Sequence, residues 1–149
     1  MINFKIINKI LGSLLFLEAL LMIVCLGMAF VFGEDDILPF MVSIVVTVFF
    51  GFLFKYHGRN AENRLSRRDS FVVVTLSWLF FSLFGTMPFL FGGYIPSFTD
   101  AFFESASGFT STGSSIINDV EALPHGILFW RSLSQWLGGL GIVFFTIAI

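Results

Sequence analysis

The sequence predicts an all-α polytopic membrane protein, with four transmembrane helices, one short re-entrant helix and an irregular loop that follows it. Of the 149 residues, 56% are hydrophobic and only 12% are charged, whereas soluble domains have roughly 45–50% apolar and about 25% charged residues. The hydrophobic residues also gather in four blocks, each near the ~17–25 residues that an α-helix needs to cross a bilayer. These blocks cover residues 10–32, 38–54, 71–92 and 126–149.

Polar segments separate the blocks and divide the chain into two regions. The sequence Gly-Glu-Asp-Asp at residues 33–36 ends the first block, and a basic linker at residues 55–68 follows the second. We therefore expect an N-terminal two-helix region with its linker, residues 1–70, and a helix–loop–helix unit, residues 71–149.

The residues near the ends of the last two predicted helices indicate where each helix begins or stops. Asp69 or Ser70 is a suitable N-cap for the third helix. Pro88 and the two glycines that follow at 92 and 93 are expected to loosen its far end. The fourth helix stops in an apolar run with no polar residue after it, so we expect the unit to be truncated and the chain to be an N-terminal fragment of a longer protein.

The distribution of charge predicts the orientation. Cytoplasmic segments of membrane proteins carry an excess of Lys and Arg. All basic residues outside the fourth block lie before the first helix or in the linker after the second, which are Lys5, Lys9, Lys55, Arg59, Arg64, Arg67 and Arg68. The N-terminus and the linker are therefore predicted to be cytoplasmic, and the segment at residues 93–125 to face outside.

The segment at residues 96–118 lies between two spans and is rich in small side chains. Residues 98–107 are predicted to form a helix, with Ser97 or Thr99 as N-cap and Gly108 just after its end. About ten residues at 1.5 Å each give ~15 Å, half of the hydrocarbon thickness. Such a helix would enter from outside and stop near the middle of the membrane.

The residues that follow this short helix have the chemistry of a cation site. Irregular backbone at membrane depth is tolerated only where it lines a cavity or is buried in protein. Carbonyl oxygens of such a segment can replace the hydration shell of an alkali cation, and the predicted ion ligands are the carbonyls of Thr110, Ser111, Thr112 and Gly113. The alternative is a re-entrant loop that only packs between helices.

Three further side chains are assigned to support of this loop: Glu104, Ser114 and Arg131. Glu104 either bonds backbone amides of the filter from behind or attracts cations, or it is satisfied by neighbouring hydroxyls such as those of Ser105 or Ser107. Arg131 lies inside the fourth block and is expected to pair with an acidic group of the loop, because a charge there must face protein. Glycines at 138, 139 and 141 predict a close approach of another backbone.

The same sequence argues against other chemistry. Glu18 lies in the middle of the first helix with no evident partner in the sequence. Glu18, Glu104 and Arg131 lie on separate segments without the spacing of an intramembrane hydrolase. We expect no enzymatic activity, no cofactor, no soft-metal site and no nucleic-acid partner.

The run SASGFTSTGSSI, followed by LFWRSLSQWLGGLGI, resembles the TrkH/KtrB/HKT superfamily of potassium transporters, and most closely its bacterial TrkH branch. The resemblance implies a multi-pass protein of the inner (plasma) membrane, built from four helix–pore loop–helix repeats around one pore, of which this chain holds the first. It also implies a homodimer partner and a cytoplasmic nucleotide-binding gating ring.

Within this resemblance, K⁺ would bind the backbone of Thr110, Ser111, Thr112 and Gly113. The loop has one glycine and no tyrosine, unlike the T-V-G-Y-G of tetrameric channels. In plant relatives a serine at the glycine position accompanies Na⁺ transport, so Gly113 favours K⁺. The expected function is potassium uptake across the bilayer through this selectivity filter. The alternative is a non-conducting membrane scaffold or assembly subunit.

Overall fold

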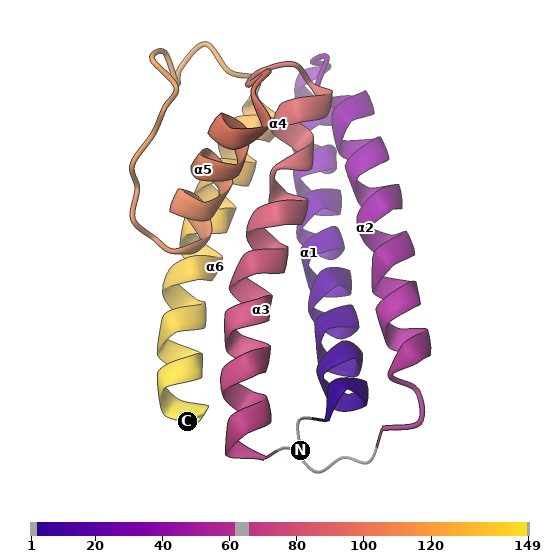
Figure 1. Ribbon diagram of the computed structural model, residues 1–149. Helices are drawn as coiled ribbons and strands as arrows, with labels where there is room; N and C mark the ends of the chain where they lie inside the picture. The colour runs from indigo at the N-terminus through magenta and orange to yellow at the C-terminus, as the bar shows by residue number, and fades with distance from the viewer. Residues whose placement is uncertain (1–2, 62–65, 149) are drawn as a thin grey trace.

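The structure, a computed structural model, describes residues 3–61 and 66–148 and is helical throughout these ranges apart from turns and loops. The predicted all-helical class is therefore confirmed for this part of the chain. Residues 62–65 of the predicted basic linker, which include Arg64, and Ile149 at the end of the predicted fourth helix lie outside the described residues. The helices, in order (Figure 1), are α1 (Phe4–Phe32), α2 (Ile37–His57), α3 (Arg67–Gly85), α4 (Met87–Phe91), α5 (Phe98–Phe109) and α6 (His125–Ala148).

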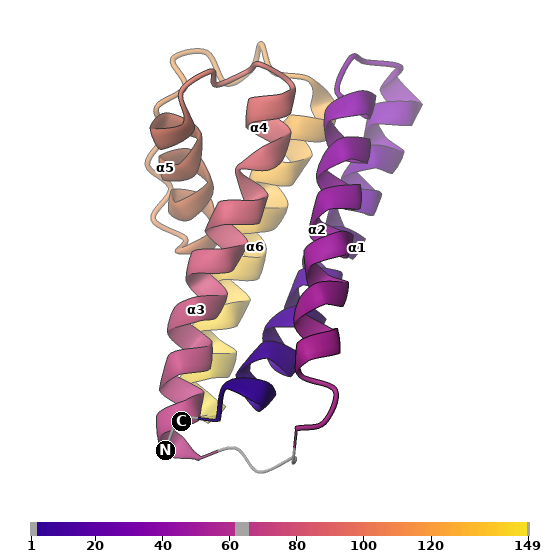
Figure 2. The same cartoon turned by 45° about the vertical axis from the view of Figure 1, so that its right-hand side comes forward.

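Three stretches within the described residues are long and apolar enough to cross a membrane. They are α1 with 29 residues, α2 with 21 residues, and the 25 residues of α3 and α4 taken together. α6 has 24 residues, contacts α1 and α5, and extends along the length of the bundle (Figures 1 and 2). Its role as a fourth span stays a prediction.

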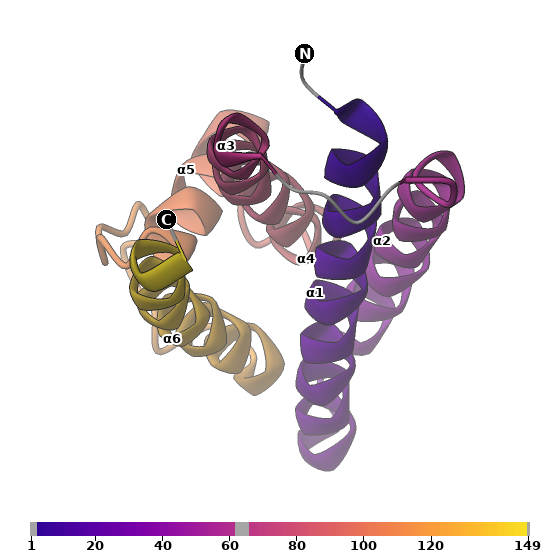
Figure 3. The same ribbon diagram turned by 90° about the horizontal axis from the view of Figure 1, so that it is seen from below.

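The helices form two groups that meet along α1. α1 packs along α2 and also contacts α3 and α6, while α5 contacts α3 and α6. Seen along the bundle, α3, α5 and α6 gather on one side and α1 with α2 on the other (Figure 3). α5 starts at the same end of the bundle as the α1–α2 turn, reaches only part of the way along α6, and is followed by a chain that returns to that end (Figure 1).

α1 begins six residues earlier than the apolar block predicts. The side chain of Asn3 accepts a hydrogen bond from the N–H of Ile6 at 3.4 Å and caps the helix. Ile6 and Ile7 are buried in a small cluster with Val73 of α3. Packing against α3 thus extends the helix toward the N-terminus. We had expected this segment to precede the first helix because it contains two lysines.

The prediction that Asp69 or Ser70 caps α3 is wrong. Ser66 is the N-cap, and its hydroxyl accepts a hydrogen bond from the N–H of Asp69 at 3.2 Å. The Asp69 carboxylate accepts a bond from the N–H of Ser66, which completes a capping box. Asp69 also accepts a bond from the N–H of Asn3 at 2.9 Å, so it joins the starts of α1 and α3.

The third apolar block is interrupted at Thr86 instead of forming one helix over residues 71–92. α3 ends at Gly85, and α4 begins at Met87 with Pro88 in its first turn. Proline lacks an N–H and its ring clashes with the carbonyl four residues earlier, which breaks a continuous helix. The indole N–H of Trp130 donates to the carbonyl of Gly85 at 3.0 Å and satisfies a backbone oxygen at the break.

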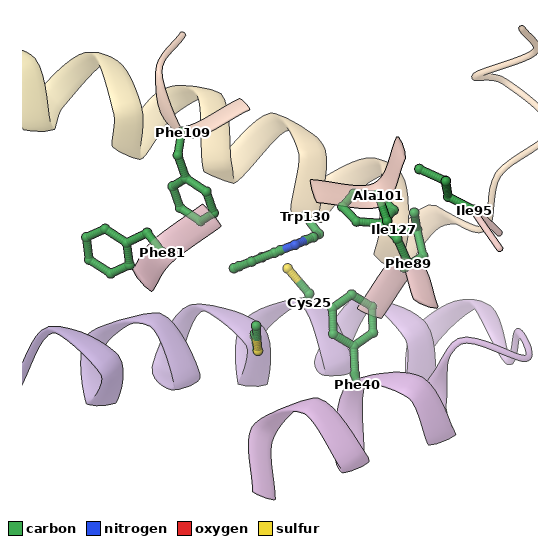
Figure 4. Close-up of a cluster of buried hydrophobic side chains, with 10 residues drawn as sticks. Cys25, Phe40, Phe81, Phe89, Ile95, Ala101, Phe109, Ile127 and Trp130 are labelled. Carbon is green, nitrogen blue, oxygen red and sulfur yellow. The ribbon is translucent and has the colours of Figure 1, made fainter. Parts of the chain in front are cut away.

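The main hydrophobic core surrounds Trp130 (Figure 4). The ring of Trp130 packs edge-on against Phe109, which stacks on Phe81 at a centroid distance of 5.4 Å. Cys25 and Phe40 close the cluster from α1 and α2. The core therefore joins the end of α5 to α3, α6 and the N-terminal pair of helices.

Candidate functional site

The candidate site starts with α5, a helix of 12 residues that spans about 18 Å at 1.5 Å per residue. Ser97 is its N-cap, and its hydroxyl accepts a bond from the N–H of Asp100 at 3.5 Å. The predicted helix start is therefore confirmed, with Ser97 as the cap instead of Thr99.

The predicted end of this helix at Gly108 is wrong. Gly108 lies inside α5, and the helix ends at Phe109 with Thr110 as C-cap. A side chain at Gly108 would collide with the hydroxyl of Ser134 on α6. The glycine is thus needed for the close approach of two helices and not for a left-handed turn.

Ser111 takes the left-handed conformation that ends α5, with φ of 55°. The N–H of Ser111 donates to the carbonyl of Gly108 at 2.9 Å, and the N–H of Thr112 donates to the carbonyl of Ser107 at 3.0 Å. These two bonds make a Schellman motif, in which the left-handed position is usually glycine because a side chain there costs about 1–2 kcal/mol. The Ser111 hydroxyl donates to the carbonyl of Gln135 on α6 at 2.9 Å and offsets part of this cost.

The chain beyond Ser111 stays attached to α5. The N–H of Gly113, which has φ of 76°, lies 3.4 Å from the carbonyl of Ser107. The hydroxyl of Ser107 donates to the carbonyl of Ser114 at 2.6 Å. Thr110 and Thr112 share a hydrogen bond between their hydroxyls at 2.9 Å. The four predicted ion ligands are therefore consecutive residues of one tight turn held against the helix.

This turn faces outward from the chain. Residues 110–116 are all exposed, whereas the opposite face of α5 is buried against α3 and α6. Across the described residues, the carbonyl oxygens of Thr110, Ser111, Thr112 and Gly113 accept no hydrogen bond. The arrangement leaves four main-chain oxygens available to something outside the chain.

Glu104 and Arg131 form an ion pair behind the loop. Nε and Nη2 of Arg131 both lie 2.7 Å from Oε1 of Glu104, and the side chains are 15% and 3% exposed for Arg131 and Glu104 respectively. Glu104 also accepts bonds from the hydroxyl of Ser115 at 3.0 Å and the N–H of Ile116 at 3.0 Å. One carboxylate therefore joins α5, α6 and the returning chain.

The contacts of Glu104 include both kinds of partner that the sequence suggested, a backbone N–H and a neighbouring hydroxyl, although neither belongs to the residues named beforehand. It bonds a backbone amide of the returning chain, at Ile116, just beyond the predicted filter residues. Within the described part of the chain, neither Ser105 nor Ser107 bonds to it, because Ser107 is engaged by Ser114 and the Ser105 hydroxyl has no partner. Arg131 pairs with an acid of the segment that precedes α6, Glu104 of α5, as we expected.

The close approach predicted from the glycines of α6 is confirmed at Gly138. A side chain at this position would collide with the carbonyl of Phe109, the last residue of α5. Gly139 leaves the Ser111 hydroxyl at ordinary contact distance. The end of α5 and the start of the loop therefore rest directly on the backbone of α6.

Sequence reasoning missed a second junction, between the α1–α2 turn and the start of α6. The N–H and ring Nδ1 of His125 lie 2.6 Å and 2.8 Å from the carboxylate oxygens of Glu34, and the ring of Phe32 stacks on His125. Hydrogen bonds from the His125 ring and backbone hold the pKa of Glu34 below its usual value. These residues lie 91 positions apart in sequence, and no local pattern indicates the contact.

Asp36 occupies the same junction. Its carboxylate is buried and lies against Gly126 at the start of α6, where a side chain on the glycine would collide with it. Burial raises the pKa of Asp36, and the neighbouring charge of Glu34 adds to this effect. Neither oxygen of this carboxylate has a hydrogen-bond partner among the described residues, so of the two acids it is Glu34 that bonds the start of α6.

The comparisons with known proteins agree with this architecture. The sequence model of the TrkH family, described as cation transport protein, matches residues 37–149. The chain belongs to the TrkH family. Its relatives include the Trk system potassium uptake proteins TrkH of Halomonas elongata and Escherichia coli, which are 38% and 34% identical to it over 148 residues.

A solved structure resembles the whole of this TrkH-family chain. The crystal structure of the potassium transporter TrkH from Vibrio parahaemolyticus matches with a TM-score of 0.92 and 36% sequence identity over 99% of the chain. The match covers 32% of that structure, and the chain covers 31% of the length of the two relatives named above. The family and its apolar helices identify this chain as part of a multi-pass membrane protein.

Proposed function

We propose that this chain takes part in potassium uptake, and that the carbonyls of Thr110, Ser111, Thr112 and Gly113 are K⁺ ligands of its selectivity filter. Relatives that match 99% of the chain are named potassium uptake proteins. A bare alkali cation needs oxygen ligands in place of its water, and this turn is a run of exposed main-chain oxygens. The scaffold alternative has no particular observation in its favour.

The direction of the carbonyls is the observation that carries the proposal. In a trans peptide the N–H and C=O point in opposite directions, and no cis peptide is present among the described residues. The N–H groups of Ser111, Thr112 and Gly113 all point back at α5. The carbonyls in the same peptide groups, those of Thr110, Ser111 and Thr112, therefore point away from the helix.

The charges behind the loop suit a cation. Arg131 would repel K⁺ if it stood alone, but Glu104 pairs with it at 2.7 Å and leaves little net charge. The dipole of α5 adds a partial negative charge of about −0.5 at the end that carries the loop. Both features favour a cation at the exposed side of the turn.

The proposed arrangement in the membrane follows from these assignments. α1, α2, the α3–α4 pair and α6 are four spans, and α5 enters only half of the bilayer. The N-terminus is cytoplasmic in the inner membrane, residues 1–70 form the peripheral two-helix region, and residues 71–149 form the first of four repeats around one pore. By resemblance, the whole protein is a homodimer that binds a cytoplasmic nucleotide-binding ring, with K⁺ as its transported ligand.

The test uses a matched pair of glycines in the full-length protein. Gly113 and Gly93 have φ of 76° and 68°, and a side chain would meet nothing within 4 Å at either position, so a serine brings the same backbone strain to both. We expect Gly113→Ser to lower K⁺ uptake about tenfold or more in a host without its own K⁺ uptake systems, equivalent to ~1.4 kcal/mol. Gly93→Ser should keep most of the uptake.

Three results would contradict the proposal. Unchanged K⁺ uptake in Gly113→Ser would exclude the filter assignment. Absence of Rb⁺ flux in liposomes that contain the folded full-length protein would favour the scaffold. Equal losses in both glycine variants would show that backbone strain, and not the position of the filter, causes the defect.

A further inference from the structure

We infer that Ser107 is a positioning residue that determines how well the filter distinguishes K⁺ from Na⁺. The inference deepens the proposed function and rests on it. Ser107 lies on α5, outside the four residues proposed to bind the ion, and its hydroxyl and carbonyl hold the loop on both sides of the last of them.

The contacts of Ser107 enclose the end of the filter. Its carbonyl accepts the N–H groups of Thr112 at 3.0 Å and Gly113 at 3.4 Å. Its hydroxyl donates to the carbonyl of Ser114 at 2.6 Å. Ser107 is buried, with 6% of the residue exposed. One serine thereby fixes three peptide groups of the loop.

The bonds of Ser107 direct some carbonyls of the loop away from α5 and one carbonyl toward it. Because N–H and C=O oppose each other in a peptide group, the bonds to the Ser107 carbonyl direct the oxygens of Ser111 and Thr112 away from α5. The hydroxyl bond does the reverse at Ser114, whose oxygen points toward α5. Ser107 therefore keeps the Ser114 oxygen out of the group of potential ion ligands while it holds its neighbours in that group.

Selectivity is the property that this arrangement affects most directly. Discrimination between K⁺ and Na⁺ is attributed either to the size of the site or to the number and field strength of its carbonyl oxygens, and both depend on where the carbonyls of the turn are held. Without the Ser107 hydroxyl, the Ser114 carbonyl loses its partner and the turn loses its attachment beyond Gly113. A turn that is no longer attached beyond Gly113 can move inward around a smaller cation and so discriminates less against Na⁺, whereas its carbonyls still permit transport.

The neighbouring serine provides a matched control. Ser105 lies on the same helix and is buried, and its hydroxyl makes no hydrogen bond in the described part of the chain. Ser105→Ala and Ser107→Ala remove the same atom from the same helix, but only the second removes a bond to the loop. Ser107→Thr keeps the hydroxyl.

The experiment measures K⁺ and Na⁺ uptake by the full-length protein in proteoliposomes. We expect Ser107→Ala to remain active and to lower the K⁺/Na⁺ uptake ratio by roughly two- to tenfold, the range that corresponds to one net hydrogen bond. Ser105→Ala should have the wild-type ratio, and Ser107→Thr should restore it.

A wild-type ratio in Ser107→Ala would overturn this inference. If Gly113→Ser still abolished uptake in the same assay, the proposed function would stand without it. If neither variant changed uptake or ratio, the filter assignment itself would fail. Should Ser107→Ala not fold, Ser107→Cys takes its place: a thiol is a weak donor, so a lowered ratio supports the inference and an unchanged ratio overturns it.

Discussion

Glu104 and Glu18 are the two glutamates buried among the described residues, and their surroundings differ completely. Glu104 is 4% exposed and contacts Arg131, Ser115 and the N–H of Ile116. Glu18 is fully buried in α1, and neither of its oxygens has a hydrogen-bond partner in the part of the chain that the structure describes. The two glutamates differ in their partners because the backbone near each of them differs.

Around Glu18 the backbone is helical, so its amides are already bonded within α1 and need nothing from a side chain. Around Glu104 the chain leaves the helix and returns through residues 110–116, where no helical ladder exists. The amides of such a segment have no partners within a helix of their own, and the Glu104 carboxylate accepts the N–H of one of them, Ile116. Glu104 therefore stabilises irregular backbone while it is paired with Arg131. Glu18 lies next to helical backbone only and has no comparable task among the described residues.

The largest effect that tests this contrast is expected at Arg131. Removal of one partner of a buried ion pair leaves an uncompensated charge and costs roughly 3–5 kcal/mol. Arg131→Met should therefore lower the unfolding free energy of the purified full-length protein by about that amount, as measured by denaturant titration in detergent. The double variant with Glu104→Gln should recover part of the loss, and purely additive losses would show that the two side chains are not coupled.

A much smaller effect is expected at Glu18. Glu18→Gln keeps the shape of the side chain and removes no hydrogen bond or ion pair within the described residues, so the unfolding free energy should change by less than about 1 kcal/mol. The same denaturant titration applies. A loss of ~3 kcal/mol or more would mean that Glu18 has an essential ionic partner elsewhere in the full-length protein, and the contrast with Glu104 would disappear.

The smallest effect concerns Glu34, a paired acid at the surface. His125 lowers the pKa of Glu34 from its ordinary value of 4.5, so the pair stabilises the fold above that pH and the stabilisation is lost as the pH falls through the lowered pKa. Glu34→Gln should therefore lower the melting temperature slightly at pH 6, with a difference from wild type that shrinks in acid.

The pH dependence caused by Asp36 has to be separated from that caused by Glu34. Burial raises the pKa of Asp36, so protonation of that group favours the fold as the pH falls, opposite in sign to Glu34. The comparison is best made in an Asp36→Asn background, with and without the Glu34→Gln substitution. A difference in melting temperature between these two proteins that does not depend on pH would contradict a role for the charge of Glu34.

The sequence allowed the class of fold and part of the site to be predicted. Arg131 was expected to pair with an acid because a charge inside an apolar helix must face protein, and that pairing is present. The capping box at Ser66 was also readable, since a serine three positions before Asp69 is its usual pattern, but the neighbouring candidates Asp69 and Ser70 were preferred.

Other features had no local signal. Gly108 lacks a side chain because Ser134 approaches it from α6, and the Ser107 bond to Ser114 depends on where the chain turns back. The contact between Glu34 and His125 joins residues 91 positions apart. Each of these depends on the relative placement of helices, which the spacing of residues along one segment does not encode.

Trp130 and Arg131 are consecutive residues of α6 that bind in different directions. The first donates to the carbonyl at the α3–α4 break, and the second pairs with α5. Neighbouring side chains on a helix diverge by about 100°, so these two bonds prevent α6 from rotating about its own axis without breaking at least one of them. The orientation of α6 is therefore coupled through side-chain bonds both to α5 and to the break between α3 and α4.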